Sequence, residues 1–222
     1  MTDRTRRHVF TSECVSEGHP DKVADQISDA ILDACLKKDP QAHVACETVV
    51  GPDVVINVGE ISCRKFNDIN TREIAARVIK RIGYTDATEH FSYDTFQYLN
   101  FLHGQSPDIA RGVSAAARLK QGAGDQGMMF GYATNETTSL LPAGVVYSRE
   151  LLNTFAKLRH SRSIPWLRPD AKCQLSVVYE KGVPVELETV VLSHQTTEKG
   201  ATAACYAVLE KIARDFLKPT GL

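Results

Sequence analysis

The sequence predicts an α+β protein in which a helix, two strands and a second helix occur twice along the chain. Apolar residues recur at helical spacing on either side of two short β-rich stretches. A glycine-containing turn divides each β-rich stretch, which is typical of an antiparallel hairpin. Because an isolated hairpin is only marginally stable, each must extend a larger sheet or pack against another sheet. We therefore expect antiparallel or mixed sheets that are covered by helices.

The first copy of this unit follows a short N-terminal stretch. Pro20 suits the first turn of its first helix, and Asp39-Pro40 would end that helix. Asp68 is the expected N-cap of its second helix, and Gly83 the expected end. The expected helix, two strands and helix cover residues 20–38, 44–50, 54–61 and 69–82.

The second copy repeats this order with little sequence identity, which indicates a structural duplication rather than a tandem repeat. Its strands are joined at Lys181-Gly182. The expected helix, two strands and helix cover residues 149–160, 173–179, 183–192 and 196–217. We expect one domain over residues 1–103 and another over residues 121–222. Between them, residues 101–131 hold six glycines, a composition that suits a mobile segment and often carries function.

Composition excludes several classes of protein. The formal net charge of −1 lacks the basic excess of a nucleic-acid-binding protein. No apolar run reaches the roughly 20 residues that span a bilayer, so we expect no membrane partner. The six cysteines form no C-x-x-C pair, which favours free buried thiols in a reducing compartment. The sequence therefore predicts a cytoplasmic protein.

Ser16-Glu17-Gly18-His19-Pro20-Asp21-Lys22 opens the first helix and is a candidate anion site. A helix start presents free N–H groups and the positive end of the helix dipole. His19 and Lys22 would add donors to a phosphate, and Asp21 is the kind of oxygen ligand that Mg²⁺ prefers. Read alone, the motif fits a plain helix start with surface charges better.

Two further stretches are weak signals when each is taken alone. Asp125 lies in the glycine-rich stretch 122–127, where glycines would let a ligand approach the backbone, although read alone the stretch fits a flexible turn better. Asp170 and Lys172 are two residues apart at the start of a strand, so they share a face and could project into one cleft. Read alone, the pair fits an ion-paired surface strand better.

Glu47 and Glu60 each interrupt an apolar strand-like run. A glutamate is costly to bury without a partner, and a cation or the amino group of a ligand would compensate its charge. The alternative is ordinary alternation on a half-exposed strand, which explains Glu47 better than Glu60.

Taken together and in this order, these stretches resemble the methionine adenosyltransferase (S-adenosylmethionine synthetase) family. The matching segments are 10–13, 16–22, 24–30, 45–48, 59–61, 105–109, 122–135 and 166–172. The resemblance implies a subunit built from three pseudo-threefold repeats, of which this chain contains two. It implies that the sulfur of L-methionine attacks C5′ of ATP, and that the released triphosphate is cleaved to phosphate and pyrophosphate.

The resemblance also assigns roles to individual residues. His19 and Lys172 correspond to catalytic groups on the triphosphate, and Asp125 and Asp170 to further ATP-binding groups. Glu60 and Gln105 correspond to methionine-binding residues, Asp21 to a Mg²⁺ ligand and Glu47 to a K⁺ ligand. Residues 104–120 correspond to the mobile loop that gates the active site, with its motif at Gln105, Ser106, Pro107, Asp108 and Ile109.

The chain departs from the family pattern in two ways. His103-Gly104 stands where the family often has a lysine, and the later family motifs, which supply more lysines and a third repeat, do not follow residue 172. Family active sites lie between subunits, so we expect a homo- or hetero-oligomer and a second polypeptide that carries the missing motifs. The alternatives are a catalytically silent assembly or regulatory subunit, and a truncated gene product.

Overall fold

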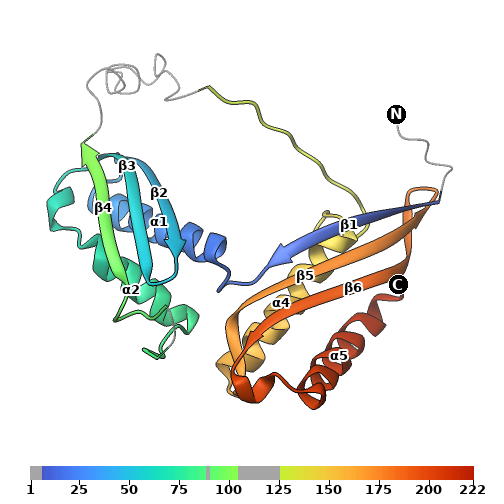
Figure 1. Cartoon of the computed structure of the whole chain (residues 1–222). Coiled ribbons are helices and arrows are strands. Elements are labelled where there is room, and N and C mark those ends of the chain that lie inside the picture. Colours follow the sequence, from blue (N-terminus) through green and yellow to red (C-terminus); the bar gives the residue numbers. More distant parts are fainter. Residues whose placement is uncertain (1–6, 89–90, 105–125) are drawn as a thin grey trace. The chain divides into compact units, whose positions relative to one another are not determined.

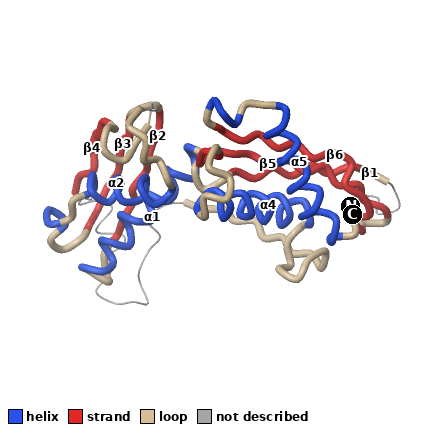
Figure 2. Tube along the Cα trace, turned by 90° about the horizontal axis from the view of Figure 1, so that it is seen from below, coloured by secondary structure: helices blue, strands red, loops and turns tan. Residues whose placement is uncertain are grey.

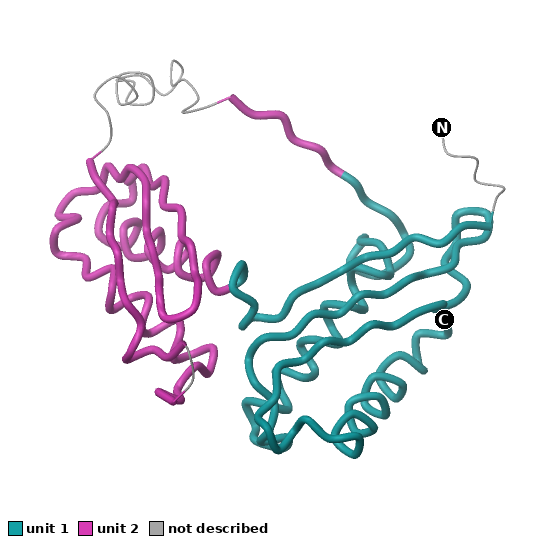
Figure 3. The backbone as a smooth tube through the Cα atoms, in the orientation of Figure 1, with its two compact units in different colours: residues 1–22, 132–222 teal, residues 23–131 magenta. Residues whose placement is uncertain are grey.

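The structure is a computed structural model that describes residues 7–88, 91–104 and 126–222. The chain forms two compact units (Figure 3). One unit spans Val23–Gly131, and the other combines Met1–Lys22 with Tyr132–Leu222. Two α-β-β-α copies are present, as the sequence predicted, and each contributes to its own sheet.

The Val23–Gly131 unit contains a three-stranded sheet in the order β2-β3-β4 (Figure 1). β2 runs antiparallel to β3, and β4 runs parallel to it. The helices pack on one face of this sheet, where alternate strand residues such as Val55 and Ile61 join their apolar sides in a single core. The elements are α1 (Pro20–Lys38), β2 (His43–Gly51), β3 (Val54–Ser62), η1 (Phe66–Asp68), α2 (Thr71–Ile82) and β4 (Gln97–Gly104).

A buried amide links the three strands of this sheet. Asn57 is fully buried on β3, and its side-chain nitrogen donates to Thr48 Oγ1 on β2 at 2.7 Å. Its side-chain oxygen accepts from the Tyr98 hydroxyl on β4 at 2.6 Å. Because both polar atoms have partners, the burial of this amide is compensated.

The N-cap of α2 differs from the expected one. Asn70 caps the helix, and its side chain accepts from the Glu73 amide at 3.1 Å. Asp68 instead lies in the short helix η1. The predicted end is confirmed: Gly83 adopts φ 112° and its amide bonds to the last carbonyls of α2, which is the left-handed cap that favours glycine.

The carboxylate of Asp39 ties the end of α1 to the end of β3. It accepts from the Arg64 backbone amide and from Arg64 Nη2, both at 3.0 Å, and from the Gln41 amide at 3.1 Å. These bonds, above all the one from the Arg64 side chain, lower the pKa of Asp39 from 3.8 to about 2.

We expect Asp39→Asn to reduce stability at neutral pH and to flatten its dependence on acid. A lowered carboxyl pKa stabilises the fold above the unfolded value of 3.8, and that stability is lost as the pH falls through about 2. Urea unfolding at pH 7 and pH 3 measures the difference. Asp68→Asn, which alters an exposed ion pair with Lys38, is the control. Equal acid sensitivity in both variants would contradict this assignment.

The second unit contains an antiparallel sheet in the order β1-β5-β6. β1 pairs along its whole length with β5, from His8 opposite Tyr179 to Val15 opposite Lys172. α4 and α5 share one apolar core with β5 (Figures 1 and 2). The elements are β1 (His8–Val15), α4 (Ala143–His160), β5 (Leu167–Glu180), β6 (Val183–Thr196), η3 (Glu198–Gly200), α5 (Ala203–Leu217) and η4 (Lys218–Thr220).

Several boundaries in this unit differ from the sequence expectation. α4 begins at Ala143 rather than residue 149, because Glu136 Oε2 accepts from the Ala143 amide at 3.0 Å and so caps the helix from outside. Both strands are longer than expected, and α5 begins only at Ala203, after Thr202 accepts from the Cys205 amide as N-cap. The turn at Lys181-Gly182 is confirmed, with positive φ at both residues.

The expectation that each hairpin extends a larger sheet is confirmed. β4 extends the first hairpin, and β1 extends the second although it precedes the first copy in sequence. The division into sequence domains at residues 103 and 121 stays a prediction, and β1 belongs to the compact unit that contains the second copy. Among the described helices, none is both long and apolar enough to cross a membrane.

Candidate functional site

The loop after β1 is joined to the start of β5 through Ser16. The Ser16 amide donates to the Ala171 carbonyl at 2.9 Å, and its hydroxyl donates to the Pro169 carbonyl at 2.8 Å. The same hydroxyl accepts from the Ala171 amide at 2.8 Å. These bonds are buried, so they hold two segments about 155 residues apart in sequence at one place.

Gly18 fits against Pro169 because it lacks a side chain. A Cβ at this position would lie 2.3 Å from Pro169 Cβ and 2.5 Å from the Pro169 carbonyl oxygen. No heavy atom fits at such distances, so the backbone of the loop reaches β5 only where a glycine stands. This contact brings the next residue, His19, to the start of β5.

His19 is mostly buried and has a defined ring orientation. Its side chain is 13% exposed, and Nδ1 accepts from the Asp21 backbone amide at 3.2 Å. An accepting Nδ1 carries no proton, so the neutral ring holds its proton on Nε2, from which it can donate to a ligand. The Asp21 carboxylate lies 3.7 Å from Nδ1 and is 87% exposed at the start of α1.

Asp170 and Lys172 alternate with buried Ala171 on β5, so they share a face as predicted. Asp170 Oδ1 is buried and has no hydrogen-bond partner among the described residues. Burial raises the pKa of Asp170, and the nearby charges of His19, Lys172 and His194 partly oppose that shift. The structure therefore brings His19 together with Asp170 and Lys172, which the sequence singled out in two separate motifs.

His194 belongs to the same group, and sequence reasoning missed it. It lies on β6 opposite Ala171, and its Nδ1 donates to the Gln195 carbonyl at 3.0 Å. Its ring meets Phe155 edge-on at 5.7 Å, and burial lowers its pKa. A histidine that alternates with polar residues at a strand end was the available signal, but the register that places it beside Asp170 is a property of the fold.

Glu47 and Glu60 lie on one face of the other unit's sheet. Ala45 is opposite Glu60 across β2 and β3, so Glu47, two residues along β2, points to the same side. This face is opposite the one the helices cover, and Glu47 is exposed while Glu60 is half-buried. Exposure of Glu47 agrees with ordinary strand alternation. Glu60 follows Gly59, which has φ 135°.

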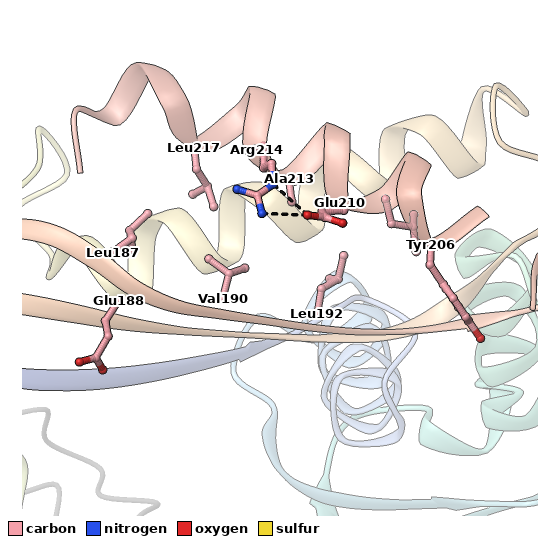
Figure 4. A pocket seen from close by; sticks show the side chains of 10 residues that line it. Leu187, Glu188, Val190, Leu192, Tyr206, Glu210, Ala213, Arg214 and Leu217 are labelled. Atoms are coloured by element: carbon pink, nitrogen blue, oxygen red, sulfur yellow. Dashed lines mark hydrogen bonds and ion pairs between the residues drawn. The ribbon is translucent and has the colours of Figure 1, made fainter. Parts of the chain in front are cut away.

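A groove of about 560 Å³ lies between β6 and α5 (Figure 4). Apolar and charged side chains line it, and Glu210 and Arg214 form an ion pair at 2.8 Å on the helix side. No residue that the sequence singled out lines this groove. Its lining residues are Leu187, Glu188, Val190, Leu192, Tyr206, Leu209, Glu210, Ala213, Arg214 and Leu217.

Comparison with known proteins assigns the family. Residues 7–107 match the model of the S-adenosylmethionine synthetase N-terminal domain, and residues 120–221 match that of its central domain. The chain belongs to the S-adenosylmethionine synthetase family.

Three similar proteins carry the name S-adenosylmethionine synthase. The protein from Treponema denticola is 46% identical over 97% of this chain and 56% of its own length. That from Sorangium cellulosum is 50% identical over 86% of this chain and 45% of its own length. That from Akkermansia muciniphila is 46% identical over 96% of this chain and 56% of its own length. The chain therefore spans about half the length of the curated relatives it matches.

Some predicted site residues lie outside the described ranges. They are Asp125 and the predicted gating motif, Gln105, Ser106, Pro107, Asp108 and Ile109. Their roles stay predictions from the family resemblance.

The described residues contain few candidate metal ligands close to one another. No group of three or more His, Cys, Asp or Glu side chains within them could hold a metal ion. The single exposed carboxylate of Asp21 fits Mg²⁺, because this ion is usually bound by one or two carboxylates together with substrate phosphates. Glu47 likewise offers one exposed carboxylate oxygen pair to a hard cation such as K⁺.

Proposed function

We propose that this chain takes part in the synthesis of S-adenosylmethionine from ATP and L-methionine, as one subunit of an enzyme completed by a second polypeptide. The observation that carries the proposal is the group of His19, Asp170 and Lys172, joined by the Ser16 bonds to β5. It combines two hydrogen-bond donors, the His19 ring and the Lys172 ammonium group, with a buried carboxylate oxygen that has no donor within the described part of the chain. The family membership and the names of the similar proteins support the reaction.

The chemistry required is attack by a weak thioether nucleophile on C5′ and departure of triphosphate. Orientation and stabilisation of the leaving group must provide most of the rate acceleration. Nε2–H of His19 and the ammonium group of Lys172 would donate to triphosphate oxygens, and the start of α1 would add its dipole. The buried Oδ1 of Asp170 would accept a hydrogen bond from the nucleoside.

The remaining groups have proposed roles on the substrates and cations. Glu60 and Gln105 would bind methionine, Asp125 would bind the adenosine moiety, and residues 105–109 would gate the site. Mg²⁺ held in part by Asp21 would neutralise triphosphate charge, and K⁺ would bind at Glu47. The second polypeptide would supply the further lysines of the family, in a homo- or hetero-oligomer.

The test measures S-adenosylmethionine formed from Mg·ATP and methionine by mass spectrometry. The chain is assayed alone and with the part of the Treponema denticola relative that lies beyond its match to this chain. We expect little product from the chain alone and a large increase with the added polypeptide. Equal activity with and without it would contradict the need for a second chain. Full activity of the complex with His19→Ala would instead support a catalytically silent subunit.

Lys172→Met tests the proposed binding site independently of assembly with a second polypeptide. Loss of a charge-assisted hydrogen bond worth roughly 1.5–3 kcal/mol should weaken the binding of Mg·tripolyphosphate about 10- to 150-fold. Isothermal titration calorimetry measures this affinity without requiring turnover. Lys211→Met, which removes an exposed lysine from α5, is the matched control and should bind normally. Unchanged affinity in Lys172→Met would remove Lys172 from the proposed site.

A further inference from the structure

The side chain of Glu17 is held by the last turn of α4. Its Oε1 accepts from Arg159 Nη2 at 2.6 Å and from His160 Nε2 at 2.7 Å. The two donors are themselves 3.1 Å apart. Glu17 lies between Ser16, which is bonded to β5, and Gly18, which is seated on Pro169. We call Glu17, Arg159 and His160 the α4 clamp.

Burial makes the clamp more than a surface ion pair. The side chain of Arg159 is 10% exposed and that of Glu17 is 33% exposed, so solvent screens their attraction incompletely. Hydrogen bonds between charged groups are shorter and stronger than neutral ones. The C-terminal carbonyls of α4 also favour cationic side chains at this position.

The clamp completes the attachment of the loop that carries His19. β5 holds one side of this loop through Ser16, and α4 holds the other side through Glu17. The His19 amide then donates to the Ser16 carbonyl at 3.1 Å, which passes the constraint on to His19. The charge of Arg159 also acts on His194, which interacts electrostatically with Asp170.

We propose that Arg159 and His160 are positioning residues, which hold Glu17 so that His19 is presented to the polyphosphate in one orientation. This inference rests on the proposed function, since it deepens the role of the same site. Arg159 and His160 act through Glu17 and need not touch the substrate. The clamp therefore orients His19, whereas Lys172 supplies positive charge to the polyphosphate.

Glu17→Gln is the sharpest test, because charge and geometry predict opposite results. Removing an anion near a polyphosphate site should tighten binding by electrostatics alone. If the clamp positions His19, the same substitution should weaken Mg·tripolyphosphate binding, on the order of tenfold. Arg159→Gln should weaken it similarly, and Arg159→Lys, which keeps the charge, should recover most of the affinity. The double variant should be little worse than either single one.

Arg214→Gln is the control, because it breaks an exposed ion pair on α5 of the same unit and should leave the affinity unchanged. Tighter binding by Glu17→Gln, or normal binding by Arg159→Gln despite a lowered melting temperature, would overturn the proposal. If the unaltered chain binds no tripolyphosphate, the proposed function fails. Amide hydrogen exchange then tests whether the clamp still holds the loop that carries His19. If Arg159→Gln increases the exchange rate of the His19 amide more than that of the Cys173 amide, relative to the unaltered chain, the clamp is supported. An equal change at both amides overturns it.

Discussion

Gly59→Ala is expected to destabilise the Val23–Gly131 unit by about 3 kcal/mol or more. Gly59 has φ 135°, a conformation that L residues rarely adopt, and a Cβ there would lie 2.0 Å from the Ala45 carbonyl oxygen. The neighbouring atom belongs to the backbone of β2, so it cannot move aside as the end of a side chain could. The substitution therefore combines backbone strain with overpacking.

Hydrogen exchange at the Val55 amide during urea unfolding reports on this unit, because Val55 is fully buried on β3. Fluorescence of Trp166, the only tryptophan, reports on the other unit and should shift less. Gly104→Ala is the control in the same sheet, since a Cβ there meets nothing within 4 Å. Equal stability of the two variants would show that Gly59 is not required for the pairing of β2 and β3.

Gly59 immediately precedes Glu60, so the same substitution should also affect ligand binding. Glu60 is a proposed methionine-binding residue, and its direction depends on the backbone just before it. A non-glycine residue would have to shift either β2 or the Glu60 peptide. Methionine binding and stability should therefore be lost together in Gly59→Ala, whereas a Glu60 substitution should affect binding alone.

Local elements were the most predictable from sequence. α1 covers the predicted range because helical spacing, a proline at its start and Asp39-Pro40 at its end are all local signals. The two hairpins were also found, since their turns contain residues suited to positive φ. β1 and β4 were not, because each pairs with a strand far away in sequence and carries no local turn signal.

The site shows the same limit. His19, Asp170 and Lys172 were identified by residue type and order, but the Ser16 bonds and the Gly18–Pro169 contact, which bring His19 to the other two, depend on the fold. Arg159 is 142 residues from Glu17, and its role depends on where α4 ends against that loop. Glu136 lies seven residues before Ala143 and caps α4, so the helix begins earlier than the predicted residue 149. Contacts of this kind depend on packing and have no spacing rule.

Gly18→Ala is expected to lower the stability of the β1-β5-β6 unit by about 2–4 kcal/mol, or to displace the loop that carries His19. The added Cβ would lie 2.3 Å from Pro169 Cβ and 2.5 Å from two backbone atoms of the same residue. Proline has a fixed φ, and Ser16 bonds hold its carbonyl, so β5 yields less readily than the loop. Binding of Mg·tripolyphosphate should fall in either case.

Trp166 fluorescence during urea unfolding measures the stability of this unit, and calorimetry measures tripolyphosphate affinity. Gly131→Ala, where a Cβ meets nothing within 4 Å, is the control for both. Retained stability with lost affinity means that the loop has moved and that His19 no longer reaches the ligand. Unchanged stability and affinity together would mean that the loop is not seated on Pro169. Comparison with Lys172→Met then separates the two causes of weak binding. Lys172→Met removes a charge and leaves the loop in place. Gly18→Ala keeps every charge and moves only the backbone.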